Sequence, residues 1–301
     1  MAMASTNLAK VYHFGKYDTP RDYAKAETLY LLTLKQSRNY SDVWYYLGRL
    51  YEYGGHGIER NLEAARHAYT KSAGQQDAYG YYNLAELYYH GKLEAEPEVF
   101  IDFYTKAAER GHAKAMARLG WIYKTGLYGP VDRAQALQYY EAAAAKGHAN
   151  AQNSLATLLV DMNLELDDSP RVIELYAAAA KQNNIYAINN YGHRIVAGDV
   201  PGMSIEAGIE LLRQAASKDY PNAMTKLANL ATQSEFQHYF TDQEIKHWAA
   251  KKAEVKQQAR ATAKRILEAA RPAVEQGRYD DALAILRAKH HNNDFSEIDR
   301  H

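Results

Sequence analysis

The chain has no cysteine among its 301 residues. Disulfide bonds, thiol catalysis and zinc sites with sulfur ligands are therefore excluded. This absence does not identify the compartment, because a periplasmic protein need not contain disulfides. The chain also lacks a net charge, since 36 Lys and Arg balance 36 Asp and Glu. That balance disfavours a dedicated nucleic-acid binder, which needs a net basic face.

Membrane, export and catalytic signals are missing as well. No apolar run approaches the roughly 20 residues that a spanning helix requires. The first five residues, MAMAS, have neither the basic start nor the apolar centre of a signal peptide. They are either a natural start or a remnant of cloning that replaces a removed leader. Phosphate-binding loops, dinucleotide fingerprints and the motifs of zinc proteases or serine hydrolases do not occur, so the sequence predicts no enzyme and no cofactor.

The chain does contain a regular repeat. A leading residue recurs every 35 to 39 residues and is always followed by Ala or Gly. This period predicts a helical solenoid, and the small residue lets the two helices of a unit approach closely. A glycine seven residues after most leading positions suits a left-handed helix end. The leading residues are Leu8, Leu47, Leu84, Leu119, Leu155, Tyr191 and Leu227, and the second helices align on Tyr69, Tyr104, Tyr140, Tyr176 and Leu212.

The segment 115–151, with Leu119-Gly120, Gly126 and Gly147-His148, resembles the Sel1-like repeat, a relative of the tetratricopeptide repeat. The resemblance covers about residues 7–233. It departs from the pattern at Met162 and Ser234, which occupy capping-glycine positions, and the unit around Met162 lacks the glycine-rich loop. The resemblance implies an all-α fold, a right-handed α–α superhelical solenoid of about six helix–turn–helix units with a C-terminal helical cap.

Four segments are predicted. Residues 1–6 form a disordered start or cloning remnant, residues 7–233 the solenoid, residues 234–289 a C-terminal helical part, and residues 290–301 a polar tail. The C-terminal part begins with a long helix over 241–271, for which Thr241 or Asp242 is the N-cap and Glu244 the third helical residue. The remainder, from Gly277, resembles the second half of a tetratricopeptide unit.

Two interpretations of the C-terminal part remain open. It is either a cap that closes the solenoid or an arm for docking or oligomerisation. Lys and Arg exceed Asp and Glu by four between residues 241 and 271. Such a run is usually a solvated helix face, and contact with an anionic partner or with lipid headgroups is the alternative.

The histidines predict no metal site. His112 and His148 occupy matching positions one period apart, where capping of a turn is the expected role. His290, His291 and His301 lie in the polar tail beside Asp294 and Glu297, where a solvated terminus is favoured over a weak metal site.

The predicted binding surface is the concave face of the solenoid. If the first helix of each unit lines this face, the inward-facing positions are two residues before the leading residue and two, five and six residues after it. Aromatic and charged residues gather at the N-terminal end of this groove, and amides at the other end. The predicted groove residues are Tyr45, Arg49, Glu52, Tyr53, Tyr82, Glu86, Tyr89, His90, Trp121, Lys124, Asn153, Thr157, Asn189, His193 and Asn229.

We therefore expect a non-enzymatic scaffold or adaptor that binds a segment of a partner protein in this groove. Aromatic anchors would supply affinity, and Arg49, Glu86 and Lys124 would set the register by charge pairing. A second interpretation follows from the resemblance: related repeat proteins are periplasmic scaffolds of bacterial exopolysaccharide secretion, so this chain would organise such a complex or contact the polysaccharide. The sequence does not distinguish a periplasmic from a cytoplasmic location, nor does it give the oligomeric state.

Overall fold

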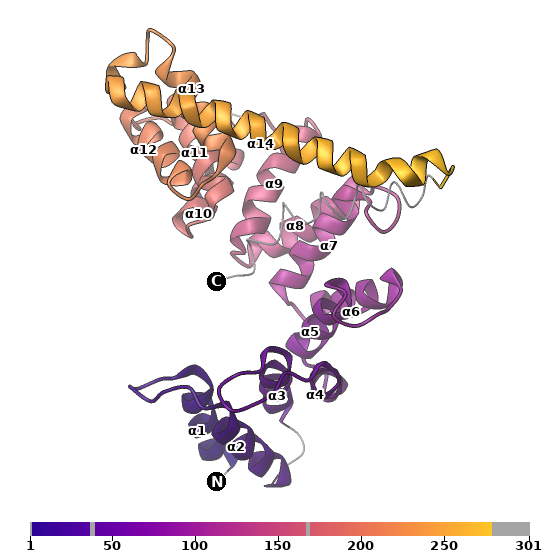
Figure 1. Cartoon of the computed structure of the whole chain (residues 1–301). Coiled ribbons are helices and arrows are strands. Elements are labelled where there is room, and N and C mark those ends of the chain that lie inside the picture. The colour runs from indigo at the N-terminus through magenta and orange to yellow at the C-terminus, as the bar shows by residue number, and fades with distance from the viewer. Residues whose placement is uncertain (1, 37–39, 167–168, 279–301) are drawn as a thin grey trace. The chain divides into compact units, whose positions relative to one another are not determined.

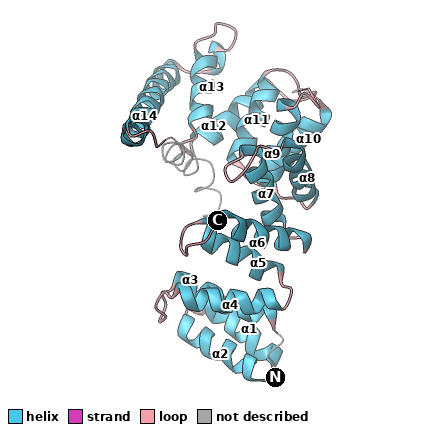
Figure 2. Cartoon of the chain, turned by 90° about the vertical axis from the view of Figure 1, so that its right-hand side faces the viewer, coloured by secondary structure: helices cyan, strands magenta, loops and turns pink. Residues whose placement is uncertain are grey.

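A computed structural model describes residues 2–36, 40–166 and 169–278. In these ranges the chain forms fourteen α-helices and one 3₁₀ helix, and no strand (Figure 1, Figure 2). The chain divides into two compact units between Leu155 and Ala156, a point that lies inside helix α9. Unit 1 is residues 1–155 and unit 2 is residues 156–301.

The helices of unit 1 are α1 (Ala2–Phe14), α2 (Tyr23–Gln36), α3 (Ser41–Tyr53), α4 (Leu62–Gly74), α5 (Ala78–Tyr89), α6 (Pro97–Glu109), α7 (Ala113–Thr125), α8 (Arg133–Ala145) and the start of α9 (Ala149–Asp161). Unit 2 continues with α10 (Pro170–Lys181), α11 (Ile185–Val196), α12 (Ile205–Ala216), α13 (Pro221–Ala231), the 3₁₀ helix η1 (Gln237–Tyr239) and α14 (Asp242–Glu275).

The helices pack as consecutive pairs. In unit 1, α1 packs on α2, α3 on α4, α5 on α6 and α7 on α8, and each pair packs on the next. In unit 2, α11 packs on α12 and α12 on α13. This is the packing of a helical-repeat solenoid, and it confirms the predicted fold class. First helices also approach one another across neighbouring pairs, since α3 contacts α5 and α11 contacts α13.

In two helix pairs of unit 1, a tyrosine of the second helix explains the glycine of the first helix. Tyr69 and Tyr140 are fully buried, and their rings lie against Gly48 and Gly120. A Cβ atom at Gly48 would stand 2.4 Å from the Tyr69 ring, and one at Gly120 would stand 2.8 Å from the Tyr140 ring. The tyrosine therefore fills the space that the missing side chain leaves, and the small residue permits the predicted close approach of the two helices.

Substituting Gly48 by alanine is expected to lower the free energy of unfolding by about 1–3 kcal/mol, because overpacking forces the Tyr69 ring or the α3 backbone to move. Urea unfolding followed by circular dichroism measures the change. Gly74 is the matched control, because it also lies in a helix and a Cβ there meets nothing within 4 Å. Equal effects of Gly48→Ala and Gly74→Ala would contradict the packing argument.

The N-terminal boundary differs from the prediction. Helix α1 begins at Ala2, so residues 2–6 are helical and are not a disordered start. Thr6 is buried, and its hydroxyl lies 3.4 Å from that of Thr33 in α2. The prediction failed because MAMAS carries no apolar periodicity, whereas the buried contact is made by a small polar side chain.

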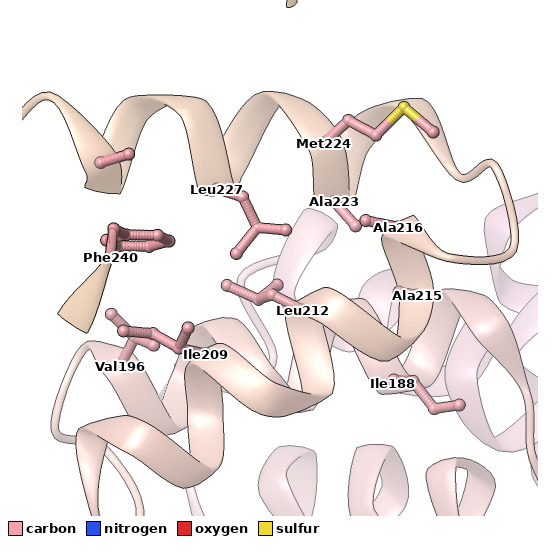
Figure 3. Close-up of a cluster of buried hydrophobic side chains, with 11 residues drawn as sticks. Ile188, Val196, Ile209, Leu212, Ala215, Ala216, Ala223, Met224, Leu227 and Phe240 are labelled. Carbon is pink, nitrogen blue, oxygen red and sulfur yellow. The ribbon is translucent and has the colours of Figure 1, made fainter. Parts of the chain in front are cut away.

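Unit 2 has its own hydrophobic core, which extends to the start of α14. Figure 3 shows Leu212 of α12 and Leu227 of α13 pointing toward one another, with Phe240 beside them. Ile245 and Trp248 of α14 pack against this core. The helix begins with the predicted capping box, in which Thr241 and Glu244 exchange hydrogen bonds, and it continues past Pro272 to Glu275.

The second half of the predicted C-terminal part, from residue 279, and the polar tail with its histidines lie outside the described residues. The described helices include none that is long and apolar enough to cross a membrane.

Candidate functional site

The predicted groove residues of α3 include one exposed aromatic ring, that of Tyr53, beside the cation Arg49. We define the Arg49 site as Tyr45, Arg49, Tyr53 and Lys92. Tyr53 is 61% exposed, and the Arg49 guanidinium carbon lies 5.8 Å from the centre of its ring. Arg49 also lies 6.0 Å from the ring of Tyr45, and its Nη1 atom donates to the Tyr45 hydroxyl at 3.5 Å. The Lys92 ammonium lies 5.8 Å from the Tyr53 ring, so two cations contact one exposed tyrosine.

A buried carboxylate holds Lys92 in place. Glu52 is only 4% exposed, and its two oxygens accept hydrogen bonds from the Tyr69 hydroxyl at 2.6 Å and from the Lys92 ammonium at 2.7 Å. Lys92 lies in the loop after α5, whereas Glu52 belongs to α3 and Tyr69 to α4. The network therefore joins two successive repeats, and its lysine contacts the Tyr53 ring.

A second buried network surrounds Glu86 on α5. Its carboxylate accepts hydrogen bonds from the Tyr104 hydroxyl and from Arg118, whose Nη2 atom is 3.4 Å away, and lies 3.2 Å from His90 Nε2. Burial by itself would raise the pKa of Glu86, but Arg118, His90 and Tyr104 outweigh it and lower the pKa to about 2. Glu86 is therefore ionised at neutral pH and serves an internal ion pair.

Three predicted anchors are not available on the surface. Tyr82, Tyr89 and Trp121 are 8%, 7% and 8% exposed, respectively. Tyr82 stacks on His112 with ring centres 4.3 Å apart, and Tyr89 lies under the Arg118 guanidinium at 4.7 Å. Their prediction as surface anchors is wrong because all three are buried, and aromatic and cationic side chains of adjacent helices cover Tyr82 and Tyr89.

Tyr79 supplies an exposed ring that the prediction missed. It is 54% exposed, and its ring centre lies 5.3 Å from that of Tyr45 and 4.9 Å from that of His112. Tyr79 precedes Tyr82 by three residues and so shares its side of α5; this spacing could have revealed it. Lys92 and Arg118 were also missed. Lys92 lies in a loop without periodicity, and no column of the repeat marks Arg118.

The other predicted groove residues lie on later first helices. Lys124 of α7 and Asn153 of α9 are half-buried in unit 1. Asn189 and His193 lie in α11 of unit 2. Asn189 is 2% exposed and donates to the Asn190 side chain at 2.9 Å, so its side chain is not at the surface of unit 2. His193 is half-buried.

The repeated histidines cap helices, as predicted. His112 Nδ1 accepts a hydrogen bond from the Ala115 N–H at 3.2 Å, and His148 Nδ1 accepts one from Ala151 at 3.3 Å. Burial of His112 is the main reason that its pKa is lowered to about 4, and Lys114 lowers it further. No group of three or more His, Asp or Glu side chains in the described part of the chain is arranged to hold a metal ion.

Comparison with known proteins agrees with the helix pairs. A family model described as Sel1 repeat matches residues 2–36, 45–77, 78–112, 113–148 and 185–220. The unmatched segment between 148 and 185 contains α9 and α10, where Met162 replaces the capping glycine and Asn163 takes a left-handed backbone conformation with φ of 54°. This is the unit that departs from the repeat pattern, and its helices nevertheless form.

Two solved structures are similar to this chain. One is a protective antigen of uropathogenic Escherichia coli strains that displays an SLR fold, with a TM-score of 0.69 and 26% identity over 84% of this chain and 54% of that one. The match thus covers about half of the antigen's length. The other is a Sel1 repeat protein from Oxalobacter formigenes, with a TM-score of 0.67 and 21% identity over 84% of this chain and 99% of that one. No curated protein matches the sequence.

Proposed function

This chain is a member of the Sel1 repeat family, a scaffold fold that generally mediates contacts between proteins, and we propose that it is a non-enzymatic adaptor. Its partner supplies an extended segment that binds along the first helices of unit 1. The observation that carries this proposal is the pair of exposed rings of Tyr53 and Tyr79. Tyr79 contacts the ring of Tyr45, and Arg49 lies against the rings of both Tyr45 and Tyr53. Exposed tyrosine and arginine side chains are the residue types that dominate protein-binding energies.

The rigidity of the surface supports the same proposal. Tyr53 stands over the buried network of Glu52, Tyr69 and Lys92, and Tyr79 stands beside the aromatic stack of His112 and Tyr82. A partner that binds such a surface loses little free energy to ordering it. The contact of α3 with α5 also favours this side, because helices that line the inner curve of a solenoid approach one another more closely than those outside.

Replacing Tyr53 by alanine is expected to weaken partner binding at least tenfold, since a hot-spot side chain contributes 2 kcal/mol or more, while roughly 1.4 kcal/mol corresponds to a factor of ten. The measurement is quantitative affinity capture from separated soluble and envelope fractions of the native host. Tyr79→Ala is a second test variant. The triple replacement of Tyr82, Tyr89 and Trp121 is unsuitable, because all three are buried.

Tyr17→Ala is the matched control, because Tyr17 is 86% exposed, lies in the turn between α1 and α2 and is not one of the residues of the Arg49 site. A partner that is captured equally by wild type, Tyr17→Ala and Tyr53→Ala would refute the assignment of the surface. The fraction that contains the partner would also give the compartment.

A second candidate function keeps the surface and changes the partner. Tyrosine rings such as Tyr53 and Tyr79 also stack on sugar rings, so a periplasmic scaffold of exopolysaccharide secretion would use the same residues. Titration with oligosaccharides from the host polysaccharide separates the two candidates. Saturable binding that is lost in Tyr53→Ala, without a captured protein, would favour the polysaccharide.

A further inference from the structure

Arg49 differs from the other cations that contact tyrosine rings of α3 and α5. Lys10, Lys92, Arg110 and Arg118 lie over such rings as well. Each of them has a carboxylate close by: Asp42 at 3.2 Å, Glu52 at 2.7 Å, Glu109 at 3.7 Å and Glu86 at 3.4 Å, respectively. Arg49 has no carboxylate within 4 Å in the described part of the chain, although it is half-buried.

The hydrogen-bonding capacity of Arg49 is also largely unused. A guanidinium carries five N–H donors, and the one acceptor in contact with that of Arg49 is the Tyr45 hydroxyl, at 3.5 Å, among the described residues. The flanking rings of Tyr45 and Tyr53 hold the guanidinium by its faces. The N–H donors lie along the edge of the guanidinium, and this edge remains available to an acceptor from a binding partner. A planar guanidinium edge matches a carboxylate, which can accept two parallel hydrogen bonds.

The charge around the site selects a singly charged anion. Lys92 is neutralised by Glu52, and Arg118 by Glu86, so Arg49 is left as one net positive charge. One carboxylate neutralises this single charge, whereas a phosphate group, with a charge near −2 at neutral pH, would leave an unbalanced negative charge beside Arg49.

We propose that Arg49 binds the side-chain carboxylate of an Asp or Glu in the partner segment, while Tyr53 and Tyr79 contact the residues next to it. This inference rests on the proposed adaptor function and names the chemistry of the segment: an acidic residue adjacent to an apolar or aromatic one. Charge pairing at one position would set the register of the segment on the repeat surface.

A phage-displayed library of random 12-residue peptides, selected against the full chain, tests the inference. Wild-type protein is expected to enrich peptides that contain Asp or Glu beside an apolar or aromatic residue. Binding of the enriched peptide is then measured by fluorescence anisotropy, together with its counterpart in which the acid is replaced by the corresponding amide. Wild-type protein should bind the amide peptide at least tenfold more weakly than the acidic peptide. The Arg49→Gln variant should bind the two peptides with equal affinity.

Lys10→Gln is the matched control, because Lys10 occupies the same repeat position as Arg49, two residues after the leading residue, and is paired with Asp42. It removes the same charge and should leave the preference for the acid intact. A preference that persists in Arg49→Gln, or that is lost equally in Lys10→Gln, would overturn the inference. Tighter binding of a phosphoserine peptide would overturn it in favour of phosphate.

The same selection separates failure of the inference from failure of the adaptor function. Enriched peptides that depend on Tyr53 but contain no acidic residue would overturn the carboxylate inference alone. If wild type enriches no peptide that depends on Tyr53, both the adaptor surface and the carboxylate inference are refuted.

Discussion

Replacing Glu86 by alanine is expected to lower the free energy of unfolding by about 3–5 kcal/mol, because it leaves the buried Arg118 charge without its carboxylate. Arg118 is 3% exposed, and the Tyr104 hydroxyl would lose its acceptor at the same time. Urea unfolding at pH 7 measures the loss. The network joins α5, α6 and α7, so its failure should affect the packing of two repeats.

Two further variants identify the cause. Glu63→Ala removes a carboxylate that is 65% exposed and paired with Arg66 on the surface of α4, and it should cost no more than about 1 kcal/mol. The double variant Glu86→Leu/Arg118→Met removes both buried charges and should be more stable than Glu86→Ala, because an unpaired buried charge costs more than an apolar pair. If the double variant is the less stable of the two, the loss does not come from the orphaned guanidinium.

The repeat predicted the fold because its columns record packing. The small residues Gly48 and Gly120 are required by the rings of Tyr69 and Tyr140, and a small residue, Ala or Gly, occupies the same position in every unit. The histidine caps and the capping box of α14 were predicted for a related reason. A helix end exposes backbone groups that nearby side chains of a few types can satisfy, so the signal is local in sequence.

The binding surface was predicted less well, because exposure depends on neighbours that no single repeat specifies. Tyr53 and Tyr89 occupy different inward positions of successive first helices, yet one is 61% exposed and the other 7%. Tyr89 is covered by Phe100 and Arg118 from the next helices, whereas the contacts of Tyr53 are the cations Arg49 and Lys92. Lys92 and Arg118 are marked by no column of the repeat, and the side chains of such neighbours decide which ring faces solvent.

The same networks connect stability with the proposed function. Glu52 neutralises Lys92, and Glu86 neutralises Arg118. Among the described cations that contact tyrosine rings of α3 and α5, Arg49 is therefore the one with no carboxylate within 4 Å. Such a surface presents one unpaired positive charge to a partner, because the neighbouring charges form ion pairs within the protein. Specificity then arises from Arg49, while the paired charges hold the tyrosines in place.

Lowering the pH from 7 to 5 is expected to destabilise the protein by about 4 kcal/mol through two buried histidines, His13 and His112. Burial is the main reason that the pKa of each is lowered from 6.5 to about 4, and Arg49 lowers that of His13 further. These two histidines are therefore protonated near pH 6.5 in the unfolded chain, but only near pH 4 in the folded chain. Their stabilising contribution is present above pH 6.5 and is lost as the pH falls toward 4, by about 2 kcal/mol per histidine at pH 5.

His112→Asn separates this effect from general acid denaturation. Asparagine caps α4 and α11 in this chain by the same hydrogen bond that His112 makes to α7, so the variant keeps a cap and removes the titrating group. Its loss of stability between pH 7 and 5, measured by urea unfolding, should be about half that of wild type. Glu86 does not confound the comparison, because its pKa of about 2 places its contribution below pH 4.5. An unchanged pH dependence in His112→Asn would show that this histidine is protonated equally in the folded and unfolded chains.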